Sequence, residues 1–295
     1  MPSTLEAVRA RCLLPPSGPV TCAVSGGADS LALLAVACDA GLEVTAVHVD
    51  HGLRPTGPAE AEVVADVAAR FGASFRGERV EVTPGGDLEA RARVARHAAI
   101  GPGALYGHTA DDQAETVLLA LVRGSGLDGV GAMRPEQHPL LAVRRADTHA
   151  LCAELGLTPV QDETNADPRF RRNRVRAEVL PLLDDVAERD VVPLLCRFAD
   201  LARTDAALLD DLAAGLDATD ARAVAAAPIP LARRAVRRWL RALNADGHPP
   251  DAAAVDRVLA VAAGSATGTE LAGGLRVRRR DQRLRADGPG SEGGR

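Results

Sequence analysis

A glycine-containing turn with hydroxyl and carboxylate side chains lies near the start of the chain. It reads Ser25-Gly26-Gly27-Ala28-Asp29-Ser30 and lies between an apolar run, residues 20–24, and a helical-looking run, residues 31–37. The first turn of a helix has unpaired N–H groups and a partial positive charge, so it binds phosphate without a basic side chain. We expect both glycines to take positive φ close to the ligand. The alternative is an ordinary helix cap, for which Ser and Asp are common.

Two further polar segments follow expected strands. Residues 42–49 are β-rich and lead into His48-Val49-Asp50-His51-Gly52-Leu53-Arg54. The short strand at residues 104–106 leads into Gly107-His108-Thr109-Ala110-Asp111-Asp112-Gln113-Ala114-Glu115-Thr116. Asp111 and Glu115 are four residues apart on one helical face, and carboxylates in a first turn are also ordinary partners of the helix dipole.

Arginines gather in two segments between these motifs and the second half of the chain. The segment 87–97 reads as a helix in which Arg93 and Arg96 are three residues apart. Five arginines lie within residues 169–176, on a chain of net charge −5. Arginine suits bidentate phosphate contacts and stacking on bases, although such a run is often only a solvated face.

Composition limits the class of protein. Hydrophobic residues make up 46% of the 295 residues and aromatic residues only 2%, so a globular core must consist mainly of Ala, Val and Leu. The five cysteines form no C-x-x-C pair, which argues against a zinc site or a disulfide framework. All 35 basic residues are arginine, and this excludes a Walker-type lysine and Schiff-base chemistry. No run resembles a membrane span or a signal peptide, so we expect a soluble cytoplasmic protein.

Alternating strands and helices predict an α/β fold with a parallel sheet and helices on both faces. Expected helices cover residues 5–14, 28–39, 59–71, 87–97, 110–122 and 147–155, and a further strand lies near 75–82. From about residue 184 the chain is rich in Ala, Leu and Arg and reads as a small helical domain. That domain closes with a hairpin at 269–285, in which Gly273-Gly274 separates two alternating runs. We expect domains at 1–183 and 184–287 and a disordered tail at 288–295.

These motifs together resemble the tRNA(Ile)-lysidine synthetases. The turn at 25–30 matches the S-G-G-x-D-S loop of the PP-loop ATP-pyrophosphatases, whose fold is of the adenine-nucleotide α-hydrolase-like type. Within that superfamily, the segments 48–54, 88–96, 107–116 and 162–181 are similar to the lysidine synthetases. The resemblance therefore rests on five motifs in order rather than on one loop.

The resemblance implies a tRNA-modifying ligase. ATP would adenylate the wobble cytidine of an isoleucine tRNA with a CAU anticodon, releasing pyrophosphate. Free lysine would then displace AMP to give lysidine. ATP as co-substrate and Mg²⁺ are implied, whereas no membrane partner is. The sequence does not fix the oligomeric state, and a homodimer is one outcome to test.

The resemblance also implies roles for individual residues. The catalytic set would be Asp29, Arg93, Asp111 and Glu115. Nucleotide binding would use Ser25, Gly26, Gly27, Ala28, Asp29, Ser30, His48, His51 and His108. Lysine and tRNA would contact Asp111, Glu115, Arg96, Arg54, Arg169, Arg172, Asn173, Arg174 and Arg176. A metal ion would be held by Asp29 with Asp111.

Departures from the family pattern and alternative functions also bear on these roles. His97 stands where the family has Tyr. We expect no third domain of the kind that longer members carry, so tRNA recognition would rest on the first two domains.

The alternatives are a tRNA-thiolating PP-loop enzyme, a non-catalytic tRNA-binding protein of the same fold, and an amide-forming ATP-pyrophosphatase. Scattered cysteines disfavour the first, and the intact loop and acidic helix disfavour the second. The arginine-rich segment and the second domain disfavour the third.

Overall fold

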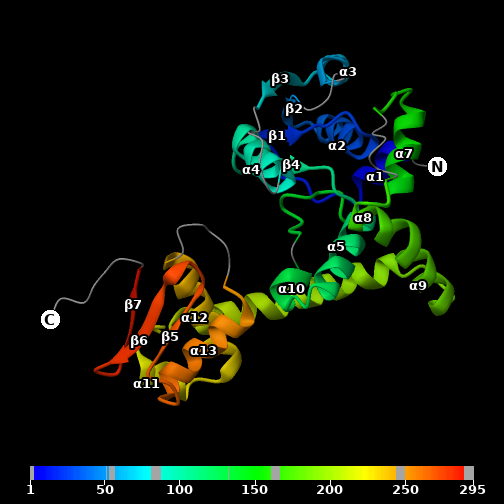
Figure 1. Cartoon of the computed structure of the whole chain (residues 1–295). Helices are drawn as coiled ribbons and strands as arrows, with labels where there is room; N and C mark the ends of the chain where they lie inside the picture. Colours follow the sequence, from blue (N-terminus) through cyan, green and yellow to red (C-terminus); the bar gives the residue numbers. More distant parts are fainter. Residues whose placement is uncertain are drawn as a thin grey trace. The chain divides into compact units, whose positions relative to one another are not determined.

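The computed structural model divides the chain into two compact units, residues Met1–Arg203 and Thr204–Arg295 (Figure 1). The domain boundary predicted after residue 183 is a different division from that between these compact units, and it stays a prediction. The structure describes residues 3–50, 52, 57–80, 88–131, 133–160, 167–243 and 250–288.

The first unit is built on a four-stranded parallel sheet. Its strands are β1 (Pro19–Ala23), β2 (Glu43–Asp50), β3 (Ser74–Arg79) and β4 (Leu105–Tyr106), in the order β3-β2-β1-β4. Thr21 pairs with Thr45 and Cys22 with Leu105, so β1 lies between its sequence neighbour β2 and the later strand β4. The strand order therefore reverses between β1 and β4, and in such sheets ligands bind beyond the carboxyl ends of the strands at this point.

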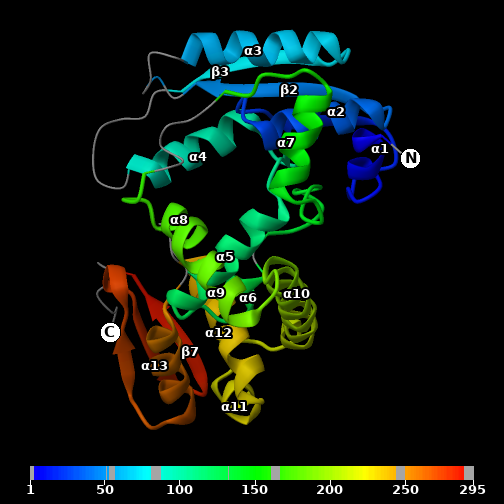
Figure 2. The same cartoon turned by 90° about the vertical axis from the view of Figure 1, so that its right-hand side faces the viewer.

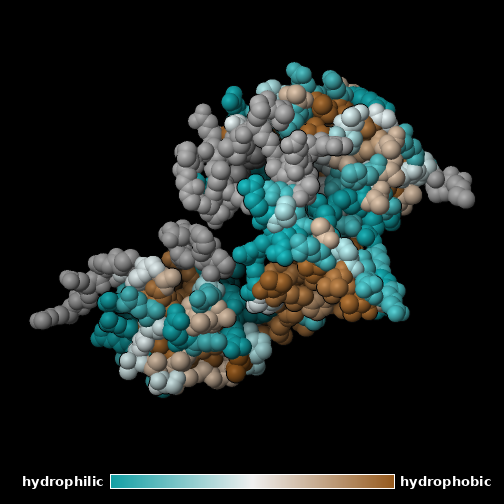
Figure 3. Space-filling model, turned by 45° about the vertical axis from the view of Figure 1, so that its right-hand side comes forward, coloured by the Kyte–Doolittle hydropathy of each residue, from teal (hydrophilic) through white to brown (hydrophobic). Residues whose placement is uncertain are grey.

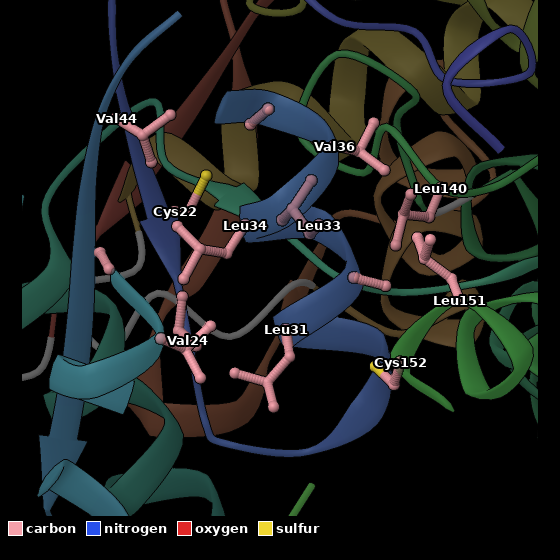
Figure 4. Packing of buried hydrophobic residues seen from close by; sticks show 14 of the residues in the cluster. Cys22, Val24, Leu31, Leu33, Leu34, Val36, Val44, Leu140, Leu151 and Cys152 are labelled. Atoms are coloured by element: carbon pink, nitrogen blue, oxygen red, sulfur yellow. The ribbon is translucent and has the colours of Figure 1, made fainter. Parts of the chain in front are cut away.

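Helices α2 (Ala28–Asp39) and α3 (Gly57–Arg70) cover one face of the sheet, and α1 (Thr4–Arg9) and α7 (Arg145–Glu154) pack against α2 and against each other (Figure 2). Every second residue of a strand faces this side, which is why Cys22 and Val24 pack here together with Val44. Helix α2 is buried all round: Leu31 and Leu34 turn to the sheet, and Val36 turns toward Leu140 and Leu151 (Figure 4). A core of Val, Leu and Ala follows from the scarcity of aromatic residues.

The opposite face is covered by α4 (Leu88–Ile100). Val47 of β2 and Tyr106 of β4 pack there with Ile100 and Ala104. The predicted parallel sheet with helices on both faces is confirmed.

The rest of the first unit is helical. Its elements are α5 (Ala110–Val122), α6 (Leu127–Val130), α8 (Arg171–Arg174), the π-helical turn Val175–Val179, α9 (Leu180–Ala187) and the start of α10 (Val192–Ala214). Ala110 and Ala114 of α5 pack against Val175 and Leu180, so the segment after α7 lies directly on α5. Pro181 has no N–H to donate, and the helix widens into the π turn just before it. No helix in the described ranges is both long and apolar enough to span a membrane.

The second unit packs three helices against a small antiparallel sheet. The helices are α11 (Ala221–Ala226), α12 (Ile229–Leu243) and α13 (Ala252–Ala263), and the strands are β5 (Gly268–Glu270), β6 (Arg276–Arg280) and β7 (Arg283–Asp287). Val236, Val258 and Val277 are fully buried between the two layers. The predicted helical character of this part is confirmed.

Gly273-Gly274 separates the antiparallel strands β5 and β6, as predicted. Two local details differ from the prediction. The run after the glycines is not one strand but two, β6 and β7, joined by a turn at Asp281 and Gln282, both with positive φ. The first helix ends at Arg9 rather than at residue 14: Ala10 is its C-cap, and the Leu13 N–H donates to the Pro139 carbonyl at 3.2 Å instead of to a helical carbonyl.

Gly107, directly after β4, approaches the backbone of α2 very closely. A Cβ atom there would lie 2.7 Å from the Asp29 carbonyl oxygen. We predict that Gly107→Ala lowers the free energy of unfolding by about 1–3 kcal/mol, because a backbone neighbour has to move to admit the methyl group. Urea unfolding of the full chain measures the effect.

Gly77→Ala is the matched control for this prediction. Gly77 lies in β3 of the same sheet, and its Cβ would meet only the Phe75 ring, at 3.4 Å or more. We expect a change within about 0.5 kcal/mol there. Equal stabilities for the two variants would contradict the close approach of Gly107 to α2.

Candidate active site

The turn between β1 and α2 has the form of a phosphate loop. Gly26 has φ of 88°, and its carbonyl accepts a hydrogen bond from the Val160 N–H at 3.0 Å. Gly27 is the N-cap of α2 with φ of −72°, so the expectation of positive φ is right for Gly26 and wrong for Gly27. Gly27 provides no capping side chain, and this leaves the first turn of α2 suited to an anion.

The two serines of the loop do different work. The Ser30 hydroxyl is buried, donates to the Gly27 carbonyl at 2.8 Å and accepts from the Ser25 N–H at 3.2 Å. Ser30 therefore braces the loop. Ser25 is exposed, so its hydroxyl is the one open to a ligand.

Asp29 lies in the first turn of α2 and is held from α7. Thr148 donates its hydroxyl hydrogen to Oδ1 of Asp29, and Arg145 Nε lies 3.6 Å from Oδ2. Burial raises the pKa of Asp29, an effect that the Thr148 hydrogen bond and the charge of Arg145 oppose. Its side chain remains 24% exposed, so one edge of the carboxylate is accessible.

Two predicted histidines lie toward the carboxyl ends of β2 and β4, the strands on either side of β1. His48 Nδ1 is 2.9 Å from the Val24 carbonyl oxygen; because that oxygen can only accept, Nδ1 carries the hydrogen. His108 Nδ1 lies 3.0 Å from His138 Nδ1, so one of these two rings donates to the other. Burial lowers the pKa of His108 to about 4, and the positive charges of Arg172 and Arg96 act in the same direction.

Three carboxylates of α5 meet four guanidinium groups. We call this set the arginine–carboxylate cluster; its members are Asp111, Asp112, Glu115, Arg144, Arg145, Arg172 and Arg176. Its formation brings residues of three separate segments into contact.

Glu115 is the centre of the cluster. It has no exposed surface and accepts from Arg172 Nε at 2.6 Å, Arg176 Nε at 2.7 Å and Arg145 Nη1 at 3.1 Å. Asp112 shares two of these partners, accepting from Arg145 Nη2 at 2.8 Å and from Arg172 Nη2 at 3.0 Å. Burial opposes ionisation of Asp112, but the two arginines outweigh it and lower its pKa to about 2.

Asp111 lies at the edge of the cluster. Arg144 donates to both of its oxygens, at 3.0 and 3.1 Å, and the backbone N–H of Arg145 donates to Oδ2 at 2.8 Å. Burial raises the pKa of Asp111, yet these hydrogen bonds leave it below its ordinary value. Glu115 thus shares its guanidinium donors with Asp112, whereas the sequence predicts Asp111 as its partner on the helical face.

The arginine-rich segment divides into inward and outward side chains. Arg172 and Arg176 turn onto Glu115, one helical turn apart. Arg169 is 86% exposed beside Asp167, and Arg174 is 60% exposed beside Glu178. Asn173 donates to the Asp167 carbonyl at 2.9 Å and holds the start of the segment in place.

Some predicted residues lie outside the described part. His51 and Arg54 are among them, and the side chain of Arg93 on α4 is not described. Arg96 lies on the same helix, and its charge acts on His108.

Sequence reasoning missed Asp112, Arg144, Arg145, Thr148 and His138. Asp112 carried a usable signal, because it is three residues before Glu115 and so shares its helical face. The other four come from residues 138–148, where no motif was visible.

The fit of a magnesium ion differs between the two predicted carboxylates. Mg²⁺ in nucleotide sites is usually held by one or two carboxylates together with phosphate oxygens. The accessible edge of Asp29 beside the loop fits that role. Both oxygens of Asp111 are engaged by Arg144 and the Arg145 amide, so Asp111 does not fit without rearrangement. Within the described residues no three His, Cys, Asp or Glu side chains group as metal ligands.

The environments of the five cysteine thiols do not favour the thiolate form. Burial raises the pKa of every thiol, to about 12 for Cys12, Cys22 and Cys196 and to about 11 for Cys38 and Cys152. A raised pKa keeps a thiol protonated and weakly nucleophilic near neutral pH.

Comparisons with known proteins cover both units. The family described as "PP-loop domain" matches residues 7–183, and the "TilS substrate binding domain" matches residues 220–285. A tRNA(Ile)-lysidine synthase of Nocardia farcinica is 50% identical over 245 residues, which is 77% of each chain. The enzyme of that name from Mycobacterium tuberculosis is 45% identical over 76% of this chain and 75% of its own.

A solved structure resembles the fold. It is the U34-tRNA thiolase NcsA from Methanococcus maripaludis with its [4Fe-4S] cluster, at a TM-score of 0.53 and 15% identity over 68% of this chain and 78% of that one. At this identity the likeness extends to the fold alone.

The neutral state of His108 makes stability depend on pH. The pKa is about 4 when folded against an ordinary 6.5, so between these values the unfolded chain binds one more proton. Stability contributed by this group is therefore complete above pH 6.5 and is lost as the pH falls toward 4, with a slope of about 1.4 kcal/mol per pH unit.

We predict that His108→Gln lowers the pH dependence of the free energy of unfolding by the contribution of one proton, about 1.4 kcal/mol per pH unit. Gln is neutral throughout, so it replaces the imidazole without a charge change. Urea unfolding at a series of pH values between 4 and 7 measures the slope for both proteins. Identical slopes would show that His108 titrates normally in the folded chain.

Proposed function

This chain belongs to the tRNA(Ile)-lysidine synthase family, and we propose that it adenylates the wobble cytidine of a CAU-anticodon isoleucine tRNA and couples free lysine to it. Membership makes it an ATP-dependent ligase that modifies tRNA. One observation carries the proposal: the guanidinium of Arg145 contacts both Asp29 of the phosphate loop and the α5 carboxylates. A tRNA substrate would put the reaction in the cytoplasm.

The first step would occur at the loop. Backbone N–H groups of the α2 N-terminus and the Ser25 hydroxyl would bind ATP phosphates, with Asp29 holding Mg²⁺ beside them. The cytidine oxygen at ring position 2 would attack the α-phosphorus, and pyrophosphate would leave. Arg93 and Arg96 of α4 are the proposed contacts to the α-phosphate or the base, and His48, His51 and His108 would border the nucleotide.

The second step needs a site for a cationic amino acid. The lysine ε-amine would attack the activated ring carbon, the bond from carbon to the AMP oxygen would break, and the amine would lose its proton. Glu115 and Asp111 are the proposed contacts of the lysine ammonium, and Asp112 joins them on geometry. Three arginines surround Glu115, so an ammonium group would take the place of at least one guanidinium.

The outward arginines would contact the tRNA backbone. Arg169 and Arg174 are exposed, as is Arg171 between them, whereas Arg172 and Arg176 would first have to leave Glu115. Arg54 is the remaining proposed contact from the first unit.

The second unit offers a further basic surface. Successive residues of a strand alternate in direction, so one face of the small sheet carries the exposed side chains of Arg276, Arg278, Arg280, Arg283 and Arg285. Arg278 is directly opposite Arg285, and Arg280 is opposite Arg283. Asp281 pairs with Arg280 and Asp217 with Arg283. Like charges placed opposite each other, as Arg278 and Arg285 are, destabilise a sheet, and a bound phosphate backbone would relieve that repulsion.

A homodimer stays a prediction. Exposed apolar side chains on α9 and α10 of the first unit would be its surface, among them Leu182, Val186, Phe198 and Leu201. Figure 3 shows hydrophobic residues gathered on one area of the molecule's surface. The mass in solution, measured by sedimentation, decides between monomer and dimer.

The direct test is lysine-dependent labelling of tRNA. We predict that the protein, with ATP, Mg²⁺ and radiolabelled lysine, transfers label to an isoleucine tRNA transcript bearing CAU and forms AMP. Asp29→Ala should lower the rate at least about 100-fold, since it removes the accessible carboxylate at the phosphates.

Other outcomes of this assay would favour the alternatives. AMP without label would point to another nucleophile, as in thiolation, which the raised thiol pKa values disfavour. No ATP turnover with any tRNA would leave a tRNA-binding protein without catalysis. Equal rates for Asp29→Ala and the unaltered protein would contradict the role of Asp29.

A charge reversal separates RNA binding from folding in the second unit. We predict that Arg278→Glu weakens tRNA binding and flattens its salt dependence, yet stabilises the unit by about 0.2–1 kcal/mol through a cross-strand pair with Arg285. Filter binding at several salt concentrations and thermal unfolding measure the two effects. Arg257→Glu, on the exposed surface of α13, is the control and should weaken binding less.

A further inference from the structure

Arg145 is the first residue of α7 and has four contacts with carboxylates of other elements. Its guanidinium meets Asp112 at 2.8 Å, Glu115 at 3.1 Å and Asp29 at 3.6 Å. Its backbone N–H donates to Asp111 at 2.8 Å. One side chain, only 20% exposed, therefore spans the carboxylate of the phosphate loop and those of α5.

The next turn of the same helix holds Asp29 as well. Thr148 is fully buried, and its hydroxyl donates a hydrogen bond to Asp29. Arg145 and Thr148 are three residues apart and so share a face of α7. Asp29 is thus fixed by two donors from one helix, while the α5 carboxylates are fixed by the same Arg145.

The arrangement needs a guanidinium rather than a generic cation. Three separate nitrogens of Arg145 address three carboxylates, a fork that an ammonium group cannot reproduce. Without it, the negative charges of Asp29, Asp112 and Glu115 would face one another with less compensation, and the side chains would separate.

We propose that Arg145, supported by Thr148, is a positioning residue that sets the relative placement of the nucleotide loop and the amine site. Arg145 acts on both steps, through Asp29 on adenylation and through Glu115 and Asp112 on lysine coupling. Thr148 acts on the first step alone, because its contact is with Asp29. This inference rests on the proposed function, since it assigns roles within the two proposed steps.

Arg145→Ala, Arg145→Lys and Thr148→Val test the proposal on the full chain. The first step is followed as tRNA-dependent exchange of pyrophosphate into ATP, and the second as the KM for lysine and the rate of label transfer. We expect Arg145→Ala to slow exchange about 100-fold and to raise the lysine KM, since small misplacements have effects of this size. Thr148→Val should slow exchange and leave the lysine KM unchanged.

Rescue distinguishes positioning from a structural role. Millimolar guanidinium ion should restore part of the activity of Arg145→Ala, and Arg145→Lys should retain the fold with a smaller loss in both steps. Arg11→Ala is the matched control: it removes one guanidinium that contacts Asp147 at the same end of α7, where both partners are substantially exposed, and both steps should keep their rates.

Each outcome decides the proposal. A loss in Arg145→Ala that guanidinium does not restore and that follows a lowered Tm would overturn it, as would rates equal to those of Arg11→Ala. A raised lysine KM in Thr148→Val would overturn the division of roles. If the unaltered protein itself transfers no lysine, the proposed function fails rather than this inference.

Discussion

The fully buried carboxylate of Glu115 determines which side chains must surround it. Leaving one ionised group unpaired in the interior costs several kcal/mol, so the chain must bring compensating charge to it. Three guanidiniums do so, from α7, from α8 and from the π-helical turn. The segment from residue 167 onward therefore lies on α5 for electrostatic as well as apolar reasons. Removing any one of these three arginines would leave the charge of Glu115 and of its neighbours less well compensated.

The nucleotide side of the site depends on close backbone contact. The switch in strand order puts β4 next to β1, and Gly107 allows the turn after β4 to touch the first turn of α2. Asp29 and His108 consequently follow adjacent strand ends. Helix α7 completes this side, because its first turns reach both the loop and α5. The phosphate loop and the α5 carboxylates are thus joined through packed structure.

Local patterns predicted much of this molecule. The apolar run at 20–24 and the β-rich run at 42–49 became neighbouring parallel strands, and the loop between β1 and α2 formed where glycine and hydroxyl residues indicated it. Gly273-Gly274 likewise separates β5 from β6, as its suitability for a tight turn indicated. The β6–β7 turn was not predictable in this way, because Asp281 and Gln282 are residue types that seldom take the positive φ they have there. The partners of Glu115 were also hidden, because Arg145 and Arg172 are 30 and 57 residues away. Only the packing of α7 and α8 on α5 decides which arginines meet which carboxylates.

The absence of lysine from the chain acquires a chemical meaning at this site. In the proposed reaction an activated cytidine waits among cationic side chains until an amine attacks it. A lysine ε-amine in the protein would compete for that electrophile and trap the enzyme on its own substrate. Guanidinium groups stay protonated in proteins and have no free electron pair to offer, so the arginine–carboxylate cluster supplies charge without supplying a nucleophile. In the proposed reaction, free lysine would therefore meet no side-chain primary amine of this chain as a competitor.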